Sequence, residues 1–139
     1  MFNKILIDIL KESVERFYVS DSILAKTGGM EQACVFRIGL YLHEIIKTNP
    51  QFQNLDLDCE YNKNQRGTKR LDGVTVRPDL IIHQRNLNNG IANDSNTLIV
   101  EFKGWWSHDT SKDIDKLRKF TGLDEGYIYK LGIFVKLGA

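Results

Sequence analysis

Two short apolar stretches of this chain, residues 77–83 and 97–103, carry charged residues where a buried strand would otherwise be uniformly apolar. Successive side chains of a strand point to opposite faces, so Glu101 and Lys103 share one face of the second stretch, and its apolar residues take the other face. Asp79 stands at the beginning of the apolar run of the first stretch. Charges on otherwise buried strands are unfavourable unless something compensates them. The pattern therefore predicts two neighbouring strands that gather three charged side chains at one place.

A divalent cation held by Asp79 and Glu101, with Lys103 beside it, would compensate these charges. Magnesium suits such a site because it binds through few carboxylates and keeps water and substrate phosphate as its other ligands. It also activates water for attack on a phosphodiester. In that chemistry Lys103 would orient or polarise the attacking water and offset charge on the phosphate. The alternative interpretation is a partly buried network of ion pairs without a metal.

The same residues carry a resemblance to a known superfamily. Pro78-Asp79 and Glu101-Phe102-Lys103 resemble the motif of the PD-(D/E)xK nucleases, which have the restriction-endonuclease-like fold. The two halves stand in the right order on apolar stretches and are separated by a turn-like segment rich in Gly and Asn. The resemblance extends from about residue 30 to residue 138. It implies that Asp79, Glu101 and the backbone carbonyl of Phe102 bind a Mg²⁺ ion, for which Mn²⁺ can substitute, and that Lys103 is catalytic.

A helix that we expect over residues 30–47 offers a further acid. Four of its apolar residues form one stripe at helical spacing: Val35, Ile38, Leu42 and Ile45. Glu31 falls on the same stripe, one turn before the first of them. The resemblance implies that an acid at this place completes the metal site, which makes Glu31 a candidate metal ligand and catalytic residue. The alternative is that its carboxylate only interacts favourably with the helix dipole.

The remaining pattern indicates a mixed α/β fold. We expect a first amphipathic helix over 3–18, a connection over 19–29, strands over 55–61 and 127–137, a polar turn-like segment over 62–72 and a helix over 110–121. A strand–helix–strand connection normally pairs its two strands in parallel, so the predicted sheet is a mixed one of the α+β kind. From residue 30 onward the order is αβββαβ, which is also the core order of the restriction-endonuclease-like fold. We expect a single domain over 1–139, in which residues 1–29 form an extra N-terminal helix and its connection.

Local clusters would have to supply any contacts with nucleic acid, because the formal net charge is only +1. Four basic residues follow one another closely without an acid among them: Lys63, Arg66, Lys69 and Arg70. They could bind phosphates beside the cleft, or they could be the solvated tip of a hairpin. Trp105 follows the lysine of the motif and could stack on a base, or it could belong to the core. Lys116, on the predicted third helix, could point toward the same cleft.

Cysteine usage and hydropathy indicate the compartment. Cys34 and Cys59 form no spaced framework and, with the three histidines, no zinc-ligand pattern. We expect two buried free thiols, which suit a reducing cytoplasm. The N-terminal residues show neither a signal peptide nor a membrane span, so we expect no association with membranes.

Together these patterns predict a cytoplasmic, magnesium-dependent nuclease that hydrolyses phosphodiester bonds of nucleic acid, DNA rather than RNA. Endonuclease and exonuclease action are both left open. We expect specificity to depend on a homodimer or on a protein partner. Two alternatives remain: a catalytically silent nuclease-fold protein that binds nucleic acid, and a protein-interaction module whose acids form surface ion pairs.

Overall fold

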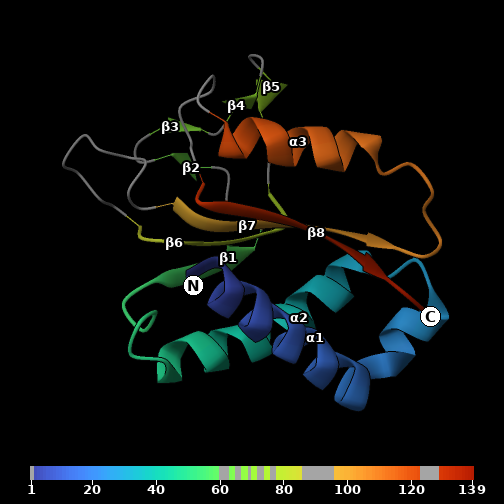
Figure 1. Cartoon of the computed structure of the whole chain (residues 1–139). Coiled ribbons are helices and arrows are strands. Elements are labelled where there is room, and N and C mark those ends of the chain that lie inside the picture. Colours follow the sequence, from blue (N-terminus) through green and yellow to red (C-terminus); the bar gives the residue numbers. More distant parts are fainter. Residues whose placement is uncertain are drawn as a thin grey trace.

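The computed structural model describes residues 2–59, 78–85, 96–122 and 129–139, together with the backbone of residues 63–64, 67–68, 70–71 and 74–75. A four-stranded sheet stands at its centre, with two helices on one face and a third helix on the other (Figure 1). The helices are α1 (Phe2–Thr27), α2 (Glu31–Thr48) and α3 (Ser111–Thr121). The strands of this sheet, in spatial order, are β1 (Asp56–Cys59), β6 (Leu80–His83), β7 (Asn96–Gly104) and β8 (Leu131–Leu137).

The strands pair in the predicted mixed way. β1 pairs antiparallel with β6, and β6 pairs antiparallel with β7. β7 and β8, which are separated in the chain by α3, run parallel. In this register Leu80 stands opposite Val100, and Glu101 stands opposite Phe134. The mixed α/β class expected from the sequence is therefore confirmed.

Alternation along β7 divides the core between the two faces of the sheet. On one face, three residues of β7 are fully buried against α1 and α2: Leu98, Val100 and Phe102. On the other face Ile99 packs with Phe120 of α3. Glu101 and Lys103 continue this second face because side chains alternate along the strand. The sequence pattern thus places both charged residues on the side of the sheet that α3 covers.

The first helix is longer than the sequence predicts. α1 continues to Thr27 with one non-helical residue, Asp21 (φ −131°, ψ 22°), so the predicted connection over 19–29 is wrong for most of its length. Two apolar residues just beyond the predicted end are exposed and interrupt the helical period of the sequence: Val19 and Ile23. Beyond them Ala25 is buried, and its carbonyl accepts a hydrogen bond from Trp105 Nε1 (2.8 Å). This contact with the end of β7 explains why the helix persists.

Some shorter segments also differ from expectation. The segment predicted to be turn-like, 62–72, contains the short strands β2 (Lys63–Asn64), β3 (Gly67–Thr68) and β4 (Arg70–Leu71). β2 pairs with β3, and β4 pairs with β5 (Val74–Thr75), which lies just beyond that segment. β8 begins later than the predicted residue 127. Cys34 is buried as expected, but Cys59 is exposed because it ends an edge strand. No helix among the described residues is long and apolar enough to cross a membrane.

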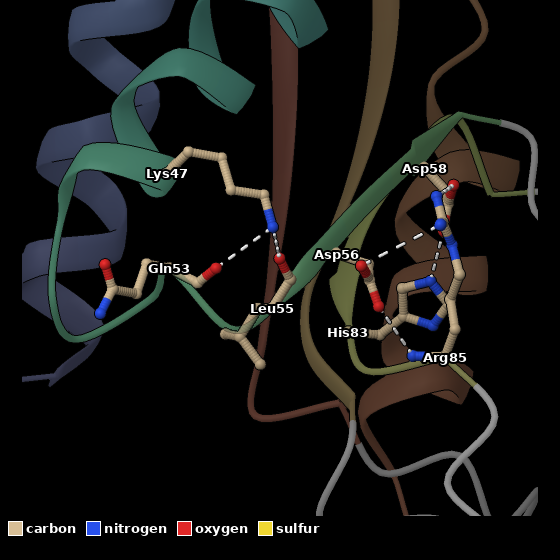
Figure 2. Close-up of polar contacts among 7 residues, drawn as sticks. All are labelled: Lys47, Gln53, Leu55, Asp56, Asp58, His83 and Arg85. Carbon is tan, nitrogen blue, oxygen red and sulfur yellow. Dashed lines mark hydrogen bonds and ion pairs between the residues drawn. The ribbon is translucent and has the colours of Figure 1, made fainter.

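Side-chain contacts tie the beginning of β1 to α2 (Figure 2). Lys47, in the last turn of α2, donates hydrogen bonds to the carbonyls of Gln53 (3.2 Å) and Leu55 (2.6 Å). One ammonium group therefore bridges two carbonyls of the connection that leads from the helix into the strand. This bridge sets where β1 begins.

A second group of contacts ties β1 to β6 and the residues that follow it (Figure 2). Asp58 accepts a hydrogen bond from Nε2 of His83 (2.7 Å), which is 4% exposed, and two more from the guanidinium of Arg85. Burial alone would raise the pKa of Asp58, but the hydrogen bonds from Arg85 and His83 outweigh burial and lower it. The aspartate is thus an ionised structural link between the two strands.

Asp58→Ala should destabilise the protein, because it removes this partly buried acceptor from His83 and Arg85. Loss of such a partner costs about 1–3 kcal/mol, which a denaturant melt at neutral pH would measure. Because the pKa of Asp58 is lowered in the folded state, the difference between the wild type and the variant should shrink as the pH falls below the usual range of an aspartate. Asp8→Ala removes only an exposed pair with Lys4 and should cost less than about 0.5 kcal/mol. Equal losses in the two variants would show that the cluster does not hold the strands together.

Candidate active site

Asp79 lies in a bend between Pro78 and the first residue of β6. Its Oδ2 accepts a hydrogen bond from the backbone N–H of Phe102 (2.8 Å), which orients the carboxylate against β7. If the register of Leu80 with Val100 continued, Pro78 would stand opposite Phe102. Proline has no N–H, so it cannot give the Phe102 carbonyl a ladder hydrogen bond. Because the N–H and C=O of one residue point to the same neighbouring strand, that carbonyl faces the side on which Asp79 lies.

The carboxyl group of Glu101 is almost completely buried between the sheet and α3. The residue is 1% exposed, and the Lys116 ammonium lies 2.9 Å from its Oε1. Besides Lys116, the carboxyl group of Asp79 is close enough to share a hydrogen bond with Glu101. Burial raises the pKa of Glu101 to about 9, the negative charge of Asp79 contributes to the rise, and Lys116 opposes it. At neutral pH the chain by itself therefore favours the neutral form of this carboxyl.

Lys103 is held by a second contact with α3. Its ammonium lies 3.0 Å from Oδ2 of Asp113, and both side chains are mostly buried, at 21% and 14% exposed. The contact with Asp113 is the main cause that raises the pKa of Lys103, and the charges of Glu31 and Asp79 raise it further. Lys103 is therefore a cation at neutral pH. It can offset negative charge on a bound group, but it cannot take up a proton.

Glu31, the first residue of α2, reaches the same group of side chains. Burial raises the pKa of its carboxyl, and the negative charge of Asp79 raises it further. Lys103 and a hydrogen bond from the backbone of Gly104 lower it. These neighbours place Glu31 at the end of β7, beside Asp79. The two acids also line a pocket of about 160 Å³, whose other walls are Gln32, Val35, Phe36 and Cys59.

Asp79 thus lies near each of the other three residues predicted to be catalytic, which are Glu31, Glu101 and Lys103. Of the two charged residues of α3 at this place, sequence reasoning raised Lys116 and missed Asp113. Both fall on the stripe that continues into the buried Leu117 and Phe120, three and four residues apart along the helix. Charged residues that extend an apolar helix stripe are the signal that could have identified Asp113.

Of the residues predicted to bind nucleic acid, the structure describes the side chain of Trp105 but not those of the four basic residues. These four side chains lie outside the described residues, so their role stays a prediction: Lys63, Arg66, Lys69 and Arg70. Trp105 is 41% exposed, and its indole N–H is bonded to the carbonyl of Ala25. Its ring packs edge-on against Trp106, with 5.7 Å between the centroids. Trp105 therefore links β7 to α1, and part of its ring remains accessible for stacking.

The oxygen donors of this cluster suit a hard divalent cation, because Mg²⁺ and Mn²⁺ prefer carboxylate and carbonyl oxygens. The Glu101 carboxyl, which is buried beside the Asp79 carboxyl group, fits such a ligand role. As the side chains stand, no three His, Cys, Asp or Glu residues among those described converge on one cation position.

Comparison of the chain with protein-family models, characterised proteins and solved structures gave no match. The function is therefore inferred from the residues and from their geometry. The cluster at the ends of β6 and β7 carries that inference.

Glu101→Gln should stabilise the metal-free protein. The folded state raises the pKa of Glu101 to about 9. The protonated carboxyl therefore makes its full contribution to the stability of the folded state below the pKa of an exposed glutamate, about 4.3. That contribution is lost as the pH rises toward the folded-state value. Glutamine cannot ionise, so thermal melts should show a higher melting temperature for the variant, by more at pH 8 than at pH 5. Each kcal/mol corresponds to roughly 3–6 °C in a domain of this size.

The matched control for this experiment is Glu44→Gln, which neutralises a side chain that is 67% exposed. Its melting temperature should show no increase over the wild type that grows with pH. If Glu101→Gln gave no gain, or the same gain at both pH values, Glu101 would not be held neutral by the fold.

Proposed function

We propose that this protein is a magnesium-dependent nuclease of the PD-(D/E)xK superfamily that hydrolyses phosphodiester bonds of DNA. The observation that carries the proposal is the meeting of Asp79, Glu101 and Lys103, with Glu31 beside them, at the ends of two neighbouring strands. Apart from the two-residue strands, the element order α2-β1-β6-β7-α3-β8 agrees with the αβββαβ order of the restriction-endonuclease-like fold. In that arrangement α1 is an addition at the N-terminal side.

The proposed cation ligands are carboxylates and one carbonyl. Asp79, Glu101 and the Phe102 carbonyl would hold Mg²⁺ or Mn²⁺, and Glu31 would complete the site. When bound, the ion activates water and stabilises the charge that develops on the phosphate. Asp79 is already oriented for this role by the backbone N–H of Phe102. Glu101 must release its proton to act as a ligand, so the affinity for the cation should rise with pH.

Lys103 supplies a fixed positive charge beside the scissile phosphate. Its contact with Asp113 raises its pKa and keeps it protonated, so its role is electrostatic stabilisation and not removal of a proton from water. Asp113 is a positioning residue that holds the ammonium at the end of β7. A charge that acts mainly on the transition state changes the rate of the chemical step more than the affinity for the cation.

Two substitutions separate catalysis from cation binding. Lys103→Met should lower the rate of cleavage by roughly 10²–10³-fold and leave Mn²⁺ binding intact. Asp79→Asn should lose both cleavage and Mn²⁺ binding, because it removes a carboxylate ligand of the cation. Calorimetry would measure Mn²⁺ binding, and single- and double-stranded DNA and RNA would be tested for cleavage in parallel. Lys4→Met, at a side chain that is 77% exposed, is the control and should behave as the wild type.

Three results would count against the proposal in different ways. Full activity of Lys103→Met would remove this lysine from the mechanism. Salt-dependent binding of nucleic acid by the wild type without cleavage would indicate the catalytically silent binding module. Absence of affinity for both Mn²⁺ and nucleic acid would contradict the proposal and favour the protein-interaction module.

Lys116 should assist cation binding through its effect on Glu101. Its ammonium opposes the rise in the pKa of Glu101, so Lys116→Met should raise that pKa further. Each unit of that rise weakens Mn²⁺ binding about tenfold at pH 7, and the loss should be smaller at pH 9. Lys116→Arg should retain binding, and Lys119→Met, which removes a partner of the exposed Asp115, is the control on the same helix. Tighter Mn²⁺ binding by Lys116→Met than by the wild type would show that the lysine competes with the cation.

A further inference from the structure

An apolar groove of about 620 Å³ separates α1 from β8. Its walls are Ile7, Leu10, Lys11, Val14 and Glu15 of α1 and residues 131–135 of β8. At one end of β8 the Tyr18 hydroxyl donates a hydrogen bond to the carbonyl of Gly138 (2.9 Å). At the other end the Lys130 ammonium lies 5.5 Å from the ring centroid of Phe2. The helix and the strand are thus joined at both ends, and the groove lies between these contacts.

β8 also presents a main-chain edge. In the spatial order β1-β6-β7-β8 it has β7 on one side, and among the described residues no strand pairs with its other side. Proteins usually protect such an edge with charge, proline or a covering element. The sequence of β8, LGIFVKL, has no proline and a single charge, Lys136, which is bonded to the carbonyl of Ser107. Ile133 and Val135 extend the main core to this edge, where they are partly buried.

Two opposite charges flank the groove. Lys11 and Glu15 are one helical turn apart on α1, and both are exposed. No ion pair joins either of them to another residue in the part of the chain that the structure describes, although Lys4 and Asp8 on the same helix pair at 3.3 Å. Across a two-fold axis, a surface patch of one copy contacts the same patch of the other copy, with the order of the residues reversed. Such an axis would therefore set Lys11 of each copy opposite Glu15 of the other.

We propose that β8 and the groove beside it form the interface between two copies of this chain, related by a two-fold axis. β8 of one copy pairs antiparallel with β8 of the other, which joins the two sheets into one. The apolar side chains along each α1 fill the groove of the partner, and two symmetric pairs of Lys11 with Glu15 fix the register. A second copy fits better than an unrelated peptide because the apolar strip and the flanking charges are self-complementary.

The symmetry also relates the two candidate sites. An axis perpendicular to the joined sheet keeps both Glu101 clusters on the face that α3 covers. The two β7 strands would then lie roughly 14 Å apart, which is three strand spacings. The interface itself is independent of the proposed nuclease activity.

Sedimentation velocity from micromolar to millimolar protein tests the interface, and the wild type should show a concentration-dependent dimer. Lys11→Glu sets two glutamates against each other at two symmetric places and should raise the dissociation constant about tenfold or more. The exchange of both charges, Lys11→Glu with Glu15→Lys, should restore the dissociation constant to within about threefold of the wild-type value, since the attractive pairs are re-formed. Lys4→Glu makes the same charge change on the same helix outside the groove and should leave the dimer unaffected.

Cross-linking identifies the contact directly. A zero-length reagent that joins amines to carboxylates is applied to a mixture of ¹⁴N- and ¹⁵N-labelled protein, and mass spectrometry should find Lys11 linked to Glu15 with one label of each kind. A protein that stays monomeric at the highest concentration overturns the proposal. A dimer that Lys11→Glu weakens no more than Lys4→Glu, or that gives no mixed-label link between these residues, overturns it as well.

Discussion

The site depends on the burial of the Glu101 carboxyl beside a second acid, Asp79. Burial and the neighbouring charge raise its pKa to about 9, so the ionised form is unfavourable in the chain alone. A protein under selection only for stability would do better with an apolar residue at such a place. The Glu101 carboxyl is retained there with the Lys116 ammonium 2.9 Å from its Oε1 and the Asp79 carboxyl group beside it. This local cost to stability is the physical reason to regard the cluster as functional.

Two features of the fold produce the geometry. The end of the β6–β7 ladder at Pro78 lets Asp79 bond to the backbone of Phe102 in place of a ladder partner. Across the sheet, α3 supplies one counter-charge to each charged residue of β7, Asp113 to Lys103 and Lys116 to Glu101. Asp113 and Lys116 are three residues apart and lie on one face of the helix. Glu101 and Lys103 are two residues apart and lie on one face of the strand, so the two pairs can meet across the interface.

The parts of the structure that could be predicted from the sequence are those governed by local periodicity. Alternation along 97–103 places Glu101 and Lys103 on one face, and the helical stripe of α2 directs Glu31 to the same end of the sheet. Asp113 was missed because its partner, Lys103, is brought to it only by packing of α3 on β7. Residues 19–27 of α1 were missed because the exposed apolar residues there interrupt the helical period, while a long-range hydrogen bond from Trp105 holds this part of the helix. The stripe of α3 could have indicated that Asp113 faces the sheet, but the identity of its partner and the extension of α1 depend on contacts between distant segments, which have no periodic signal.

A crystal structure of the wild type grown or soaked with Mn²⁺ would test the central claim most directly, by the anomalous signal of the metal. One strong peak is expected between Asp79 and Glu101, about 2.0–2.6 Å from a carboxylate oxygen of each and from the Phe102 carbonyl. No peak at this position when the crystal is saturated with Mn²⁺ would contradict the proposed site.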